Sequence, residues 1–83
     1  MEISAYQLIE QLDSFPKTGL VEFSLSGNEI WLRSATANYE AVGEQTIKVS
    51  GRSAYGLISF DESTMLIDVD EIEYIRHSSG ESN

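Results

Sequence analysis

The first apolar residues of the chain recur with the spacing of a helix. They follow the i, i+3, i+4, i+7 rule of one buried helix face, at Ala5, Leu8, Ile9 and Leu12. Ser4 directly precedes this pattern and Gln7 follows Ser4 three residues later, which is the spacing of a capping box. The Phe-Pro pair at 15–16 disfavours helical backbone angles. The sequence therefore predicts a helix that begins at Ala5 and ends near Ser14.

From residue 20 onward the apolar period changes from that of a helix to two, which is typical of strands. The Gly27-Asn28 pair predicts a two-residue turn, so that residues whose numbers sum to 55 face each other. This register pairs Glu22 with Arg33 on one side of the hairpin. On the other side it gathers one apolar face, formed by Val21, Phe23, Leu25, Ile30 and Leu32.

The second half of the chain repeats the alternation in three segments, 46–50, 53–60 and 65–69. A turn at 51–52 and a loop at 61–64 predict a meander in which each segment pairs with the next. The apolar face would then hold Ile47, Val49, Ala54, Ile58, Phe60, Met65, Ile67 and Val69. Residues 34–45 are compatible with either a short strand or an edge segment. Residues 72–77 are compatible with either a last strand or a helical turn.

Together these elements predict a single α+β domain over residues 1–77 and a flexible polar tail over 78–83. An N-terminal helix would precede a four- to five-stranded antiparallel meander, with curling into a small barrel as the alternative to an open sheet. The order of elements resembles that of small bent-sheet barrels, including the Sm-like type. That resemblance concerns architecture, and no Sm motif is present to support the RNA binding for which the family is known.

The composition is that of a folded domain, and it disfavours several classes of ligand. The chain has 83 residues, of which 41 % are apolar and 23 % are charged, an ordinary globular mixture. Fourteen acids against five bases give a formal charge of −9, which repels the phosphate backbone and disfavours direct nucleic-acid binding. The absence of cysteine excludes disulfides, thiolate zinc sites and cysteine nucleophiles.

The apolar runs are far shorter than the roughly 20 residues that cross a bilayer, and the N-terminus has no basic segment followed by an apolar one. We therefore expect a cytoplasmic protein without a membrane anchor.

Candidate catalytic and metal-binding motifs are weak. The single histidine, His77, lies beside the tail, so we favour a solvated side chain over a general base. The stretch 51–56 has glycines at both ends but no Lys-Ser/Thr ending, and a hairpin turn explains it better than a phosphate loop. Asp68, Asp70 and Glu71 do not have the spacing of a calcium loop. We expect no enzymatic activity, no cofactor and no metal.

The acids are distributed unevenly. Residues 57–83 carry seven acids and one base, and no base interrupts the chain from 53 to 75. Such a run projects a negative potential that attracts a basic partner. A coat that only improves solubility explains the same pattern equally well. The candidate partner-binding carboxylates are Asp61, Glu62, Asp68, Asp70, Glu71 and Glu73.

The face opposite the predicted apolar core also carries large side chains. In addition to Leu20, the candidate contact residues on it are Trp31, Tyr55, Leu57 and Leu66. They would form either an exposed patch or a second small core under segment 34–45. Tryptophan and tyrosine are common anchors of protein interfaces.

These features favour a non-enzymatic acidic protein that docks a basic surface of a protein partner, such as a nucleic-acid-binding protein, and occludes it. In size, charge and lack of catalytic residues the chain resembles the small acidic inhibitors that phages and mobile elements encode against defence nucleases. The alternative is a structural or assembly module that self-associates through the outward aromatic and apolar residues. A small enzyme that uses carboxylates is a further rival, and it would need an apolar pocket holding two close acids.

Overall fold

The computed structural model describes residues 2–52 and 64–79, which form one α-helix, six strands and two short 3-10 turns. In chain order they are α1 (Ala5–Asp13), β1 (Leu20–Leu25), β2 (Asn28–Arg33), η1 (Ser34–Thr36), β3 (Asn38–Ala41), β4 (Thr46–Ser50), β5 (Thr64–Asp68), η2 (Val69–Glu71) and β6 (Ile72–Ser78).

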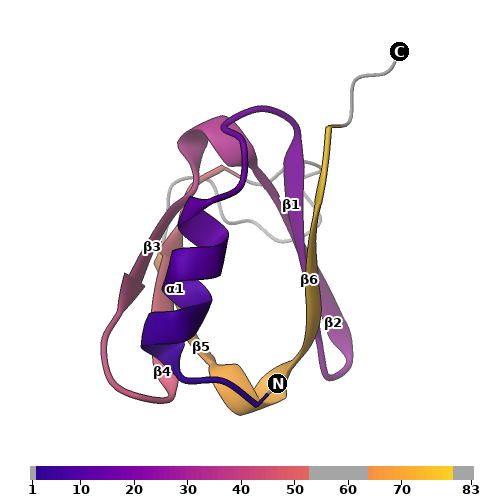
Figure 1. Cartoon of the computed structure of the whole chain (residues 1–83). Coiled ribbons are helices and arrows are strands. Elements are labelled where there is room, and N and C mark those ends of the chain that lie inside the picture. The colour runs from indigo at the N-terminus through magenta and orange to yellow at the C-terminus, as the bar shows by residue number, and fades with distance from the viewer. Residues whose placement is uncertain (1, 53–63, 80–83) are drawn as a thin grey trace.

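The six strands form two antiparallel sheets of three strands each, in the orders β2-β1-β6 and β3-β4-β5. The two sheets stand opposite each other, and α1 lies beside β3 and β4 (Figure 1). The predicted α+β class is confirmed, although the described residues contain six strands rather than four or five. Within the same residues the sheets do not close into a barrel.

The helix begins where its capping box predicts. The Gln7 backbone N–H donates to Ser4 Oγ at 3.2 Å, and the Ser4 N–H donates to Gln7 Oε1 at 3.0 Å. These bonds satisfy backbone donors that have no partner within the helix. Ala5, Leu8 and Leu12 are buried on the face that packs against the sheet.

The β1–β2 hairpin forms, but its predicted register is wrong by two residues. The turn consists of Ser26 and Gly27, so that Phe23 faces Ile30 and Glu22 faces Trp31. Gly27 has a φ of +85°, a conformation that glycine adopts without steric cost. A shift of two residues leaves each side chain on its predicted face, because the side-chain period of a strand is also two. The predicted Glu22–Arg33 pair is lost.

The predicted pairing of 46–50 with 53–60 is also wrong. β4 pairs with β3 on one edge and with β5 on the other, which leaves no edge for a third partner. Segment 34–45, which the sequence left open, supplies η1 and β3. The predicted pairing of 65–69 with 56–60 lies outside the described residues.

Residues 72–78 form a strand, and β6 joins the sheet of β1 instead of extending the meander. The ladder has a register shift at Ser24/Leu25. Gly19 contacts this strand so closely that a β-carbon there would collide with the Ser78 carbonyl oxygen. The predicted tail thus loses Ser78 to β6, and residues 80–83 lie outside the described part.

A single core fills the space between the two sheets and α1. Strands of both sheets contribute to it, and most of the predicted apolar face is confirmed: Val21, Phe23, Ile30, Leu32, Ile47, Val49, Ile67 and Val69 are buried. Leu25 and Met65 are partly buried. The predicted core positions 54, 58 and 60 lie outside the described residues.

Candidate functional site

Three backbone hydrogen bonds join four segments at one end of the molecule. The Ala5 N–H donates to the Glu44 carbonyl at 2.8 Å, the Val69 N–H to Gln45 at 2.7 Å, and the Ser26 N–H to Glu71 at 3.2 Å. They connect the helix start, the β3–β4 turn, η2 and the β1–β2 turn, which all lie at the lower end of the view in Figure 1. Segments from distant parts of the chain therefore share one surface.

Five exposed carboxylates decorate this end and the start of β6, and we call them the acidic end: Glu44, Asp68, Asp70, Glu71 and Glu73. Four of them were predicted from the sequence as candidate partner-binding residues. Glu44 was not, because it reaches this surface through a contact between the β3–β4 turn and the helix start.

The geometry of η2 explains why its acids point outward. A 3-10 turn repeats every three residues, so side chains three positions apart lie on the same side. Val69 and Ile72 have this spacing and both are buried. Asp70 and Glu71, between them, are exposed. Asp68 stabilises the turn at its start, since its Oδ1 accepts the Asp70 N–H at 3.1 Å.

The bases of the chain do not neutralise the acidic end. Lys48 Nζ lies 3.2 Å from Glu40 Oε1, and Arg76 Nε lies 2.6 Å from Glu22 Oε1. In the described part of the chain, no lysine or arginine forms an ion pair with a carboxylate of the acidic end.

The other three bases lie toward the opposite end. The Arg33 N–H donates to the Arg52 carbonyl at 3.1 Å, and Ser34 bonds to the backbone of Pro16 and Gly19 on either side of Lys17. These contacts bring Lys17, Arg33 and Arg52 together around η1, which is at the top of Figure 1. The five carboxylates of the acidic end are thus separated from these three bases along the length of the sheets.

The outer face of the β2-β1-β6 sheet carries a buried carboxylate that the sequence did not predict. Glu22 is 2 % exposed. It accepts the Arg76 Nε–H, and the Tyr74 hydroxyl lies 3.5 Å from its other oxygen. The hydrogen bond to Glu22 and the negative charge of Glu22 raise the pKa of Arg76 above its ordinary value. The Arg76 guanidinium also lies 5.7 Å from the centre of the Tyr74 ring.

The predicted aromatic and apolar contact residues are not brought together as far as the structure describes them. Trp31 is half-buried on the outer face of β2, with its Nε1 3.4 Å from Glu29 Oε1. Leu66 is 64 % exposed on β5, in the other sheet. The outer faces of two sheets around one core point away from each other. Of the remaining candidates, Tyr55, Leu57, Asp61 and Glu62 lie outside the described residues.

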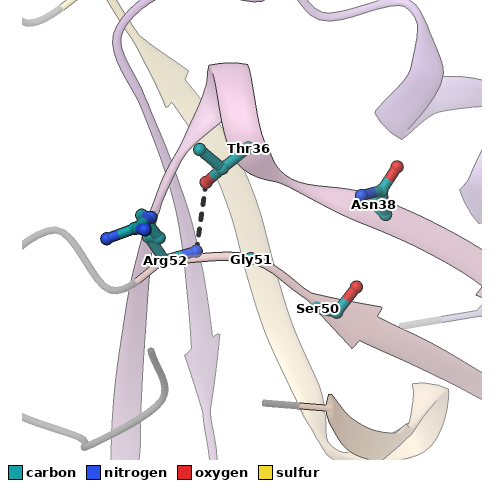
Figure 2. A pocket seen from close by; sticks show the side chains of 5 residues that line it. All are labelled: Thr36, Asn38, Ser50, Gly51 and Arg52. Carbon is teal, nitrogen blue, oxygen red and sulfur yellow. Dashed lines mark hydrogen bonds between the residues drawn. The ribbon is translucent and has the colours of Figure 1, made fainter. Parts of the chain in front are cut away.

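A shallow depression of about 280 Å³ lies between η1 and the end of β4, lined by Thr36, Asn38, Ser50, Gly51 and Arg52 (Figure 2). Its lining is polar, and the Arg52 N–H donates to Thr36 Oγ1 at 3.0 Å. No histidine or carboxylate that could serve as a general base lines it. Nor do three metal-ligating side chains of the described residues converge anywhere.

His77 is more tightly held than the sequence predicts. Its Nε2 lies 2.6 Å from the Thr18 carbonyl oxygen, and its ring stacks on Phe15 with 5.4 Å between centroids. The expected solvated side chain is instead part of the contact between β6 and the segment that follows α1.

Comparison with protein-family models, with curated proteins and with solved structures found no match. Within the described residues, no helix is long and apolar enough to cross a membrane.

Proposed function

We propose that this chain is a non-enzymatic binding protein whose acidic end docks a basic surface of a protein partner. The observation that supports this proposal is the separation of charge: five exposed carboxylates gather at one end, while the described bases either pair elsewhere or lie toward the other end. Carboxylates that are not paired within the molecule are available to a partner.

The mode of action that we propose is occlusion. Carboxylates on the acidic end would occupy the cationic positions at which a nucleic-acid-binding protein holds phosphates. Electrostatic attraction of this kind accelerates encounter and selects the partner by charge. The rigid attachment of the acidic end through backbone hydrogen bonds supports this mode, since little conformational entropy is lost on binding.

The decisive experiment compares two charge variants of equal net charge. One reverses three acids of the acidic end, Glu44→Lys, Asp70→Lys and Glu71→Lys, and leaves Asp68 in place because it caps η2. The control reverses three exposed acids of α1 and β3, with Glu10→Lys, Asp13→Lys and Glu40→Lys. Each reversal adds two charges, so both variants have a formal charge of −3 instead of −9.

Both variants and the wild type are immobilised and exposed to an extract of the native cells at about 0.05 M and about 0.5 M salt. We expect the wild type and the control to retain the same basic protein at low salt, and the acidic-end variant to lose it. The purified partner should then release its nucleic acid when the wild type is added. Equal loss of capture by both variants would overturn the proposal, and so would a captured protein that keeps its nucleic acid.

A further inference from the structure

Among the described residues, β6 is the edge strand of its sheet, because β1 pairs with one of its edges and no described strand pairs with the other. Its pairing with β1 extends from Ile72, opposite Leu25, to Ser78, opposite Leu20. From Glu73 to Ser78, the other edge forms no backbone hydrogen bond with the part of the chain that the structure describes. Such an edge presents a row of backbone donors and acceptors to solvent.

Side-chain contacts hold β6 in place along most of its length. Glu73 lies 3.4 Å from the Ser24 hydroxyl, Arg76 bonds to the buried Glu22, and His77 bonds to the Thr18 carbonyl. These contacts connect the strand to β1 and to the segment before β1. The free edge is therefore preorganised, which lowers the entropic cost of adding another strand.

The charges near the edge select its occupant. Asp70 and Glu71 in η2 and Glu73 at the beginning of β6 are exposed, and no base in the described part of the chain pairs with them. A second copy would bring its own charge of −9 and be repelled, whereas a basic segment would be attracted. Arg76 lies further along the strand, so the bases of an added segment belong beside the first half of β6.

We propose that β6 accepts an extended segment rich in lysine or arginine from the protein partner, which adds to the β2-β1-β6 sheet as a fourth strand. This inference rests on the proposed function and specifies how the partner is held. Backbone hydrogen bonds to β6 would supply affinity, and Glu71 and Glu73 would supply the preference for bases. Tyr74, which is 42 % exposed, would contact an apolar side chain of the added strand.

The test uses two capped ten-residue probe peptides of alternating valine and lysine. One has ordinary amides, and the other is N-methylated at its six central amides, which removes backbone donors on both edges while keeping the charge. Affinity is measured by fluorescence anisotropy, and amide hydrogen exchange of the protein is followed by NMR. We expect the N-methylated peptide to bind more weakly by about ten-fold, and the ordinary peptide to slow exchange of alternate amides between Glu73 and Ser78.

Matched neutral variants test the contribution of charge. Glu71→Gln with Glu73→Gln should weaken binding of the ordinary peptide by about five-fold. The control variant, Glu10→Gln with Asp13→Asn, removes the same charge from α1 and should change the affinity for the ordinary peptide little.

Equal affinity of the two peptides, with no change in exchange on β6, would overturn strand addition and leave docking by the acidic end intact. Amide exchange on β6 that becomes slower as protein concentration rises, without peptide, would also overturn strand addition by a partner. It would indicate that two copies of the chain pair through β6. Failure of the proposed function would appear separately, as equal capture by the acidic-end and control variants in the extract experiment.

Discussion

Tyr39 connects β3 to the core at the level of a single residue. Its ring centroid lies 6.1 Å from that of Phe23. Burial raises the pKa of the Tyr39 hydroxyl above its ordinary value of 10.0, and the charge of Asp13 raises it further. The folded state therefore favours the neutral phenol more strongly than the unfolded state does.

This shift predicts a loss of stability in alkaline solution. The contribution of Tyr39 is fully present below the unfolded pKa near 10 and is lost as the pH rises above it. Between about pH 8 and about pH 11, wild type should lose more free energy of unfolding than Tyr39→Phe, as measured by urea denaturation. Tyr6→Phe, which alters a side chain that is 57 % exposed, should retain the loss of the wild type. Identical pH profiles for wild type and Tyr39→Phe would contradict the prediction.

At the scale of elements, β1 and β6 are joined by a charge pair of which one partner is buried. Glu22 is 2 % exposed, and the Arg76 side chain is 63 % exposed. Removing the partner of a buried charge destabilises a protein more than replacing both partners by apolar residues does. The pair therefore provides a measure of how firmly β6 is attached.

We expect Arg76→Leu to lower the melting temperature, and the double variant Glu22→Leu with Arg76→Leu to recover most of the loss. Arg33→Leu is the matched control, because Arg33 is the exposed partner that the simple hairpin register assigns to Glu22. It should leave the melting temperature almost unchanged. A double variant that is less stable than Arg76→Leu would contradict this account of the pair.

The elements also show which parts of the fold a sequence can reveal. The sequence near each residue was enough to predict α1, because its capping residues and its apolar positions are close together in the chain. It was also enough to predict which side chains of each strand face the core. The hairpin register was missed because a shift of two residues preserves both faces. The strands that pair with β4 were not predicted correctly, because the alternation of apolar and polar residues in β4 is the same whichever strands lie beside it. For the site, the acids of η2 were visible as a run, whereas Glu44 and the Glu22–Arg76 pair depend on contacts between distant segments.

The whole molecule carries a net charge of −9, so repulsion among the acids opposes the compact state. We expect the melting temperature of wild type to rise with salt, because screening weakens that repulsion. A gain of about 1 kcal/mol would correspond to about 4–8 °C in a domain of this size.

The comparison of the two triple variants locates the repulsion. Reversal of Glu44, Asp70 and Glu71 should flatten the salt dependence more than reversal of Glu10, Asp13 and Glu40, because the first three lie on segments joined to one another. Circular dichroism melts over a series of sodium chloride concentrations measure this difference. Equal slopes for both variants would indicate that net charge alone, and not the position of the acids, sets the salt dependence of the melting temperature.

Within the described residues, the position of Lys17, Arg33 and Arg52 near η1, away from the acids of η2, contributes an electric dipole moment. In the electric field of a cationic molecule, a protein with such a dipole experiences a torque in addition to the attraction of its net charge. It would rotate while still diffusing and arrive with its negative pole first. Fewer collisions would then be lost to wrong orientations, and productive contact would begin at the corner from which β6 starts.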